Sequence, residues 1–158
     1  MDPLTEDHWK TIEGLHEDIF KTVEPLSDDE INWRHPALSN TIGILLRHLT
    51  GSERSWILGV VGGRKSELEA RVRDAEFGHE RLEKAQLLVT LRDALAEVKA
   101  ALERISPEDL RQVVEGEWRG RPYRYTKEWA LLHSLQHTAY NLGQIQLFRK
   151  MVTEGTTR

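Results

Sequence analysis

The chain has 158 residues, of which 39% are hydrophobic and 30% are charged, a balance typical of a folded globular protein. Its 22 basic and 26 acidic residues are mixed along the chain and give a net charge of −4. No segment has the basic density or motif of a nucleic-acid-binding protein, so we expect no nucleic-acid partner. The absence of cysteine excludes disulfides and thiolate chemistry, so any metal must be held by nitrogen and oxygen ligands.

The N-terminal segment predicts a helix and no targeting sequence. Its first seven residues are polar and acidic, unlike a signal peptide. The longest apolar stretch, residues 56–61, is too short to span a bilayer, so we expect no membrane association and a cytoplasmic location. Ile12, Leu15 and Ile19 recur at helical spacing and predict a first helix over residues 4–23.

A second long helix follows a short connection. Ser27 and the acidic residues after it predict one short helical turn, and residues 33–36 predict an extended connection. The cap signal at residues 39–41 then opens a helix that is expected to continue to about residue 61, where two glycines end it.

The C-terminal half predicts two more helices. The charge-rich residues 64–84 indicate a solvated connection with some helical character. Leucines at heptad-like steps predict a third helix over residues 86–105, and Ser106-Pro107 predicts another short turn. Residues 113–125, rich in glycine and aromatic residues, indicate a loop or small hairpin. A fourth helix is expected over residues 126–151, with fraying after residue 152.

Four long helical segments with almost no strand signal predict an all-α four-helix bundle that forms one domain over residues 1–158. The seven histidines are the candidates for chemistry. Three of them have charged neighbours and are expected on the solvated surface: His8, His16 and His79. His35 is expected to have a structural role in a connection. Glu53 and Arg54 are expected to form an ordinary solvent-side pair.

The fourth predicted helix carries a polar row on an otherwise apolar segment. His133, His137 and Asn141 are spaced four residues apart, and Gln144 lies near the same row. Two imidazoles at this spacing can chelate a divalent metal, although the spacing also arises by chance and by itself favours a structural or surface role. Buried polar groups need partners, which here are each other, water, a metal or a ligand.

His48 lies in the middle of the second predicted helix and is the candidate to contact this polar row. If the second and fourth helices face each other, His48 and His137 meet in one polar pocket between them. We expect four further residues to line that pocket: Trp56, His133, Tyr140 and Gln144. Three aromatic residues of the 113–125 segment are candidates for its mouth: Trp118, Tyr123 and Tyr125.

Two segments resemble a known protein family. Residues 41–56, TIGILLRHLTGSERSW, are similar to the pattern N-x-I-G-x-L-L-x-H-L-x-G-x-E-R-x-W of DinB/YfiT-like proteins. Residues 132–145, LHSLQHTAYNLGQI, resemble the pattern H-x-x-x-H-x-x-x-H-x-G-Q-I of their last helix. The resemblance implies a four-helix bundle with an up-down-down-up connection, and the element order agrees with it along the whole chain.

The resemblance also implies a divalent metal, often nickel or zinc. Its ligands would map onto His48, His137 and position 141, where the family normally has histidine and this chain has Asn141. An amide oxygen is a poorer ligand than imidazole for these metals. Three outcomes remain open: weak metal binding with Asn141 as third ligand, loss of the metal with a hydrogen-bonded pocket left behind, or a shifted site that uses His133.

Some members of this family are transferases or isomerases that use bacterial low-molecular-weight thiols, bacillithiol or mycothiol. The resemblance therefore implies a metal-dependent, thiol-using transferase that acts on a small molecule, with His48 and His137 as catalytic residues. A metal ion would lower the pKa of a bound thiol, and without it one of these histidines can act as the base. The alternative is a non-catalytic bundle whose degenerate site binds a small ligand or partner. The family also suggests a homodimer.

Overall fold

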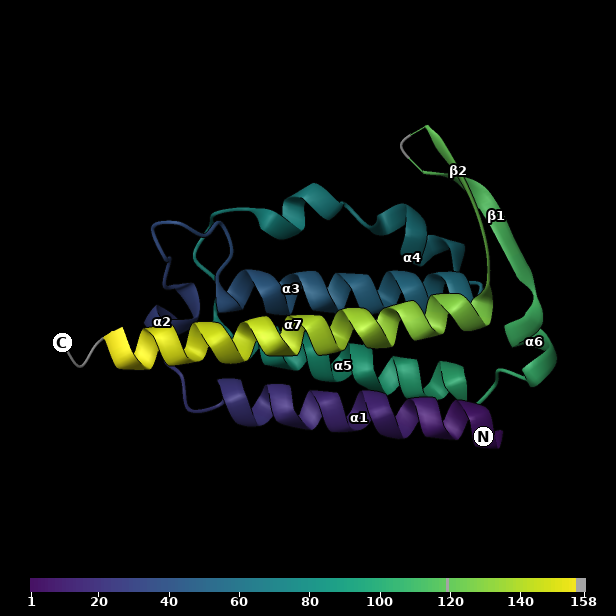
Figure 1. Cartoon of the computed structure of the whole chain (residues 1–158), viewed down its shortest axis with the longest axis horizontal. Helices are drawn as coiled ribbons and strands as arrows, with labels where there is room; N and C mark the ends of the chain where they lie inside the picture. The colour runs from purple at the N-terminus through teal and green to yellow at the C-terminus, as the bar shows by residue number, and fades with distance from the viewer. Residues whose placement is uncertain (119, 156–158) are drawn as a thin grey trace.

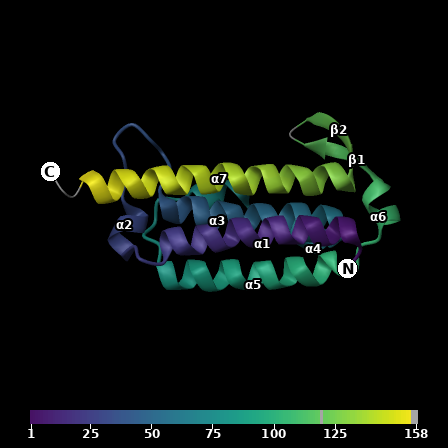
Figure 2. The same ribbon diagram turned by 60° about the horizontal axis from the view of Figure 1, so that its bottom comes forward.

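The computed structural model describes residues 1–118 and 120–155, and most of them are helical (Figure 1). Four long helical segments lie lengthwise beside one another, as the rotated view in Figure 2 also shows. They are α1 (Pro3–Val23), α3 (Ile42–Glu53) with its continuation η1 (Arg54–Val61), α5 (Lys84–Leu102) and α7 (Lys127–Gly155). The predicted all-α bundle is confirmed.

The bundle has an up-down-down-up arrangement. α1 and α7 run in one direction, and α3 and α5 run in the other (Figure 1). α7 packs against α1 and α3, while α5 packs against the other sides of the same two helices. The chain returns along the bundle between η1 and α5 through a long connector, residues 62–83, which contains α4 (Lys65–Ala70) and η2 (Arg73–Phe77). This connector is what allows α5 to run parallel to α3.

Side-chain caps begin several helices where the sequence predicted them. The hydroxyl of Thr41 accepts a hydrogen bond from the backbone N–H of Ile44 (3.1 Å) at the start of α3. The short helices α2 (Asp28–Asn32) and α6 (Pro107–Arg111) both begin with a capping box whose N-cap is a serine. These reciprocal hydrogen bonds satisfy backbone N–H groups that have no partner within the helix.

A β-hairpin precedes α7 at one end of the bundle (Figure 1). β1 (Val113–Trp118) pairs antiparallel with β2 (Arg121–Thr126), with the first residue of β1 opposite the last residue of β2. Gly120 has a φ of +76°, a left-handed conformation that glycine adopts without steric cost. Of the two structures expected for residues 113–125, the hairpin is the one that forms.

The second helix extends to Val61, as expected, and its last segment, η1, is π-helical, a feature that apolar spacing does not reveal. Two sequence-based expectations about the elements were wrong. α7 continues to Gly155, past the expected fraying point, while residues 156–158 lie outside the described chain. The connector is not solvated throughout, because the side chain of Glu76 is only 8% exposed.

A buried polar layer divides the hydrophobic core into two clusters. One cluster lies towards the end of the bundle where α3 begins and includes Ile19, Leu49 and Ile145. The other lies towards the hairpin and includes Ile12 and Ile57. Between them, the layer is formed by one residue from each of three helices: His16 of α1, Glu53 of α3 and Thr138 of α7.

This layer overturns two predictions about surface residues. His16 and Glu53 are each 1% exposed, and Glu53 bonds His16 and Thr138 instead of pairing with Arg54 in solvent. His8 is buried as well, and its Nδ1 lies 2.7 Å from the carbonyl oxygen of Leu4. These histidines were misplaced because their neighbours in sequence are charged, although each side chain lies on the inner side of α1.

The other two peripheral histidines have different environments. His79 is exposed, as predicted. His35 is half-buried, and its Nδ1 accepts a hydrogen bond from the backbone N–H of Ala37 (3.1 Å), which agrees with the structural role expected for it.

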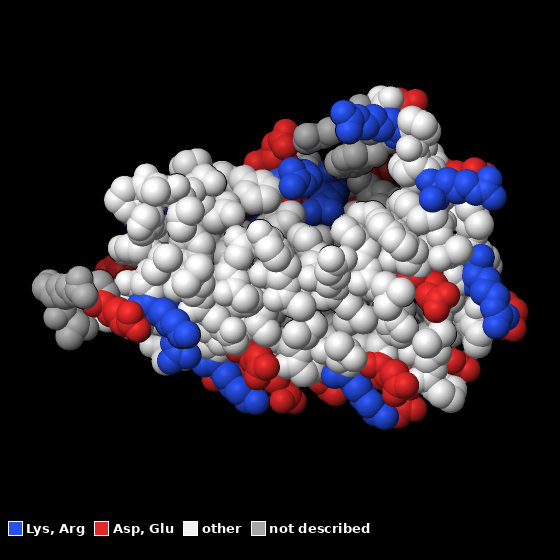
Figure 3. Space-filling view, in the orientation of Figure 1, with Lys and Arg blue, Asp and Glu red and all other residues white. Residues whose placement is uncertain are grey.

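The outer face of α7 is largely uncharged, and Figure 3 shows it as a broad white band across the middle of the molecule. Its exposed apolar side chains include Leu132, Tyr140 and Leu147. None of the helices within residues 1–118 and 120–155 has both the length and the apolarity needed to cross a bilayer. The band is a surface patch on a helix whose opposite side is buried.

Candidate functional site

The imidazoles of His48 and His137 meet between α3 and α7. Their Nε2 atoms lie 3.1 Å apart, and the two rings are nearly perpendicular, at 73°. His48 is 7% exposed and His137 is half-buried. The two residues are 89 positions apart in the chain, so the antiparallel packing of α3 against α7 creates this site.

A carboxylate from the connector orients His48. The Nδ1 of His48 lies 2.7 Å from Oε2 of Glu76, and Arg71 holds the same carboxylate through hydrogen bonds of 2.7 and 3.1 Å. Although burial acts to raise the pKa of Glu76, the hydrogen bonds from His48 and Arg71 lower it below its ordinary value. Glu76 is therefore an anion that accepts the Nδ1–H of His48 and leaves the Nε2 lone pair facing His137.

Gly51 makes room for this carboxylate. A β-carbon at position 51 would lie 2.3 Å from Oε1 and 2.9 Å from the carboxyl carbon of Glu76. Both distances are too short for non-bonded atoms. The glycine one turn after His48 is thus required for Glu76 to reach the imidazole.

Asn141 faces His137 with its amide nitrogen. The Nδ2 of Asn141 donates to the carbonyl oxygen of His137 (2.8 Å) and lies 3.2 Å from its Nδ1 and 3.3 Å from its Nε2. The bond to the carbonyl fixes the orientation of the amide, because the reverse orientation would place two acceptors together. An N–H that donates to Nδ1 favours the tautomer of His137 with its proton on Nε2, which then donates to the Nε2 of His48.

These contacts define how well a divalent metal fits. Two imidazole nitrogens converge on one point, and Glu76 gives His48 the carboxylate partner that is typical of metal-binding histidines. The third protein donor is limited to the amide oxygen of Asn141, and the described residues contain no group of three histidine, aspartate or glutamate side chains that could hold a metal. The residues therefore suit a metal held by two imidazoles, with solvent or a ligand in its other positions.

Burial keeps His137 neutral. It lowers the pKa of His137 to about 4, and electrostatic interactions with four neighbouring residues act in the same direction: His48, His133, Arg71 and Arg73. Burial also lowers the pKa of His133. A neutral imidazole is the form that binds metals and accepts protons, so His137 has that form at neutral pH.

His133 belongs to an aromatic cluster beside the histidine pair. Its ring stacks on that of Trp129, with the ring centroids 5.0 Å apart and an angle of 8° between the ring planes. It packs edge-to-face with Trp56 at a centroid distance of 4.7 Å. The centroid of the His133 ring lies 6.4 Å from that of His137. Tyr125 of β2 also contacts Trp56 and Trp129. His133 and Trp56 therefore lie beside the site, as expected, and no described contact joins His133 to His48.

For the other residues predicted to line the pocket or its mouth, the described part of the chain shows no hydrogen bond or ring contact with the histidine pair. Tyr123 stacks on Tyr125 and continues the aromatic cluster onto the hairpin, whereas the side chain of Trp118 lies outside the described part of the chain. Gln144 is half-buried, two turns beyond His137 on α7. Tyr140 is 68% exposed on the outer face of α7, so the expectation that it lines the pocket is wrong.

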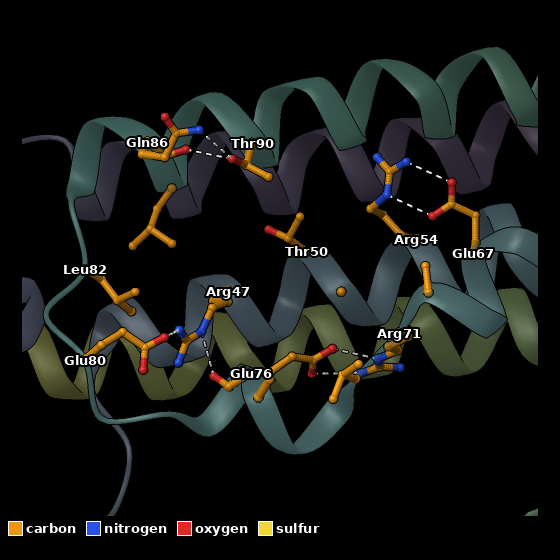
Figure 4. A pocket seen from close by; sticks show the side chains of 15 residues that line it. Arg47, Thr50, Arg54, Glu67, Arg71, Glu76, Glu80, Leu82, Gln86 and Thr90 are labelled. Atoms are coloured by element: carbon orange, nitrogen blue, oxygen red, sulfur yellow. Dashed lines mark hydrogen bonds and ion pairs between the residues drawn. The ribbon is translucent and has the colours of Figure 1, made fainter.

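A separate cavity of about 610 Å³ lies on the other side of Glu76, between α3, α5 and the connector (Figure 4). Three arginines line it, and each pairs with a glutamate: Arg47 with Glu80, Arg54 with Glu67 and Arg71 with Glu76. Its remaining wall is largely apolar. Glu76 and Arg71 thus form the partition between this cavity and the histidine pair.

Sequence reasoning missed the residues that surround the imidazole of His48. Three residues of the charge-rich connector surround His48, and the connector has no helical periodicity that would have placed them there: Arg71, Glu76 and Phe77. The centroid of the Phe77 ring lies 4.8 Å from that of the His48 ring. The aromatic residue in an otherwise polar segment was the one available signal that this connector packs against the bundle.

Comparison with known proteins identifies the fold and the family of this chain. The structure is similar to the crystal structure of the conserved protein of locus from Enterococcus faecalis, with a TM-score of 0.76 and 18% identity over 98% of this chain and 99% of that one. No curated protein matches the sequence. The family model of the DinB superfamily matches residues 11–145, which include His48, His137 and Asn141. The chain belongs to the DinB superfamily.

Proposed function

We propose that this chain is an enzyme that transfers a group to or from a low-molecular-weight thiol, with a weakly held divalent metal, nickel or zinc, at His48 and His137. The observation that carries the proposal is the convergence of the two Nε2 atoms, 3.1 Å apart, with Glu76 on the far side of His48. The thiol must come from a cosubstrate, because the chain has no cysteine.

The metal would supply Lewis acidity that lowers the pKa of a thiol bound to it. The protein's own groups orient the reaction. Glu76 fixes the tautomer of His48, and burial keeps His137 neutral. In the metal-free state, an Nε2 lone pair of this pair accepts the thiol proton as the S–H bond breaks. The thiolate sulfur then bonds to the electrophilic carbon of the second substrate, while the bond from that carbon to its leaving group breaks and the leaving group departs with the bonding electrons.

A second candidate function is a non-catalytic bundle whose degenerate site binds a small ligand or partner. The observation that favours it is the orientation of Asn141, whose amide nitrogen, a donor, faces His137 where a third metal ligand is expected. In that case the two histidines form a hydrogen-bonded pair and no metal is needed to satisfy them.

Metal titration separates the two candidates. Metal-free protein is titrated calorimetrically with zinc or nickel, and elemental analysis gives the bound metal. His48→Ala and His137→Ala should each weaken binding by about tenfold or more, because each removes one of two imidazole ligands. His79→Ala is the matched control, because His79 is exposed. If wild-type protein binds no metal even when it is supplied, the metal-dependent reading is wrong.

Thiol consumption tests the catalytic part. Bacillithiol or mycothiol is incubated with 1-chloro-2,4-dinitrobenzene, and the loss of free thiol is followed with and without protein. Wild-type protein should accelerate the loss, and His137→Ala should not. Equal rates for the two proteins would remove the transferase assignment for this electrophile class and leave the ligand-binding bundle as the better description.

A further inference from the structure

We propose that Arg73 anchors the carboxylate of the molecule that binds at the His48–His137 pair, so that this site selects carboxylate-bearing small molecules. The proposal rests on the proposed function for the identity of the site, and it adds the chemical class of the ligand. Three observations carry it: the position of Arg73, its lack of an anionic partner, and the neutralisation of the other arginines around it.

Arg73 and His48 contact the same aromatic ring. The guanidinium carbon of Arg73 lies 5.2 Å from the centroid of the Phe77 ring, and the centroid of the His48 ring lies 4.8 Å from it. The guanidinium is also close enough to act electrostatically on His137. Figure 3 shows basic side chains at the edge of a hollow between the hairpin and the η2 segment, the segment that begins at Arg73.

Arg73 differs from its neighbours in having no counter-ion. Within residues 1–118 and 120–155 it forms no ion pair, and its described partner is the face of Phe77. Arg47, Arg54 and Arg71 are all paired with glutamates, as the dashed lines in Figure 4 show. An exposed guanidinium beside the buried imidazole of His48 and the half-buried imidazole of His137 therefore leaves one positive charge at the site.

The charge of the site favours a carboxylate over a phosphate ester. A phosphate ester has a charge near −2 at neutral pH and needs more than one free cation. Arg71 is committed to Glu76 through two hydrogen bonds, so Arg73 is the free cation that the described connector offers here. A planar guanidinium matches a single carboxylate through two parallel hydrogen bonds.

Two matched probes test the proposal. N-acetylcysteine and N-acetylcysteine amide are both thiols and differ in whether the terminal carboxyl group is charged. Their affinities for the full-length protein are measured by calorimetry at neutral pH. Wild-type protein should bind the acid about tenfold more tightly than the amide, the difference expected for one charge-assisted contact near the surface.

Arg73→Gln should abolish this preference by weakening binding of the acid while leaving the amide unchanged. Arg73→Lys should retain part of it, because the charge remains and the planar donor pair is lost. Arg111→Gln is the matched control, since Arg111 is an exposed arginine on α6. An unchanged preference in Arg73→Gln would overturn the proposal, and so would equal binding of the two probes, or binding of neither at millimolar concentration, in wild type.

The same proteins distinguish this proposal from the proposed function. Arg73→Gln should keep the wild-type metal content, because Arg73 is not a metal ligand. If wild-type protein binds no metal and consumes no thiol but still prefers the acid through Arg73, the enzyme assignment fails and the carboxylate site stands. If metal and thiol behave as proposed but the preference is absent, only the role of Arg73 fails.

Discussion

The imidazole of His16 and the carboxylate of Glu53 lie 3.0 Å apart in the middle of the bundle core, and both side chains are 1% exposed. His16 Nδ1 also lies 2.9 Å from the carbonyl oxygen of Ile12, and the second oxygen of Glu53 accepts a hydrogen bond from Thr138 (2.8 Å). The layer thus joins α1, α3 and α7 through fully partnered polar groups. Its position next to His137 in α7 fixes the register in which α3 and α7 present their histidines.

Replacing one member of this pair should be far more damaging than replacing both. His16→Leu leaves a buried carboxylate that has lost its main partner, and we expect it to lower the free energy of unfolding by about 3 kcal/mol. Glu53→Leu should also be destabilising, whereas the double variant should lose much less than the sum of the two. Urea denaturation of the four proteins measures these values. Additive losses would show that the two side chains do not stabilise each other.

The same pair should make stability depend on pH. Burial opposes the charged form of His16, but the charge of Glu53 and the hydrogen bonds that His16 donates to Glu53 and to the Ile12 carbonyl raise the pKa of His16 above its ordinary value. The folded state therefore holds this proton more tightly than the unfolded state. The resulting stability is fully present below the unfolded histidine pKa, about 6.5, and is lost as pH rises through the higher folded pKa.

Urea unfolding from pH 6 to pH 9 checks this sign. The advantage of wild-type protein over the His16→Leu/Glu53→Leu double variant should shrink as pH rises, because the double variant has no proton to lose at this layer. The difference between the two proteins removes the contribution of the other histidines. A constant or growing advantage would contradict the raised pKa.

Apolar periodicity was sufficient to predict the bundle but not its polar layer. Ile12, Ile19 and Leu49 mark buried faces that any helical reading finds. His16 lies on the same face of α1 between two of these isoleucines, yet its charged sequence neighbours suggested solvent. The position of a residue around the helix axis was a better guide to its burial than the charge of the residues beside it.

The candidate site was predictable only where its residues lie on helices. His48 and His137 were found because each falls within a recognisable helical motif, and α3 and α7 hold them at fixed positions. Glu76 comes from a connector whose path depends on tertiary ion pairs such as Arg71 with Glu76. Local sequence has no period that reveals such a path, so the group that orients His48 required the structure.

Gly51→Ala tests whether Glu76 supports the site. The added methyl group would overlap the Glu76 carboxylate and displace it from His48. We expect metal affinity to fall by about tenfold, the size typical of losing a hydrogen-bond partner of a metal ligand. Glu76→Gln should have a similar effect.

Gly14→Ala is the matched control for the glycine change. Gly14 lies in α1, and a β-carbon there would meet nothing within 4 Å. Alanine at this position should raise the free energy of unfolding by about 0.5–1 kcal/mol through helix propensity and leave the metal affinity unchanged. If Gly51→Ala also left the affinity unchanged, Glu76 would have no part in the function of His48.

The uncharged outer face of α7 is the expected contact for a homodimer. It exposes Leu132, Tyr140 and Leu147 along one side of the helix, and exposed apolar surface marks interaction sites. Light scattering after gel filtration should give the mass of a dimer for wild-type protein and of a monomer for Leu147→Glu. Val89→Glu, at an exposed position on α5, is the control and should remain dimeric. A monomeric wild type would contradict the prediction.

Asn141→His should convert the site into a stronger metal centre. It would place a third imidazole one turn from His137, and nickel and zinc prefer nitrogen donors to an amide oxygen. We expect the calorimetric affinity for zinc to rise by at least about tenfold. An unchanged affinity would mean that position 141 does not face the point on which His48 and His137 converge.

Asn141→Ala then decides what the natural side chain does. If the amide oxygen of Asn141 is a weak ligand, alanine should reduce the zinc affinity. If instead the amide nitrogen holds His137 in the tautomer with its proton on Nε2, alanine removes that constraint, and the affinity should stay constant or rise. The contact from Asn141 Nδ2 to the His137 carbonyl favours the second result, because it turns the donor end of the amide towards the imidazole. A fall in affinity with alanine would show that the amide rotates to offer its oxygen when the metal binds.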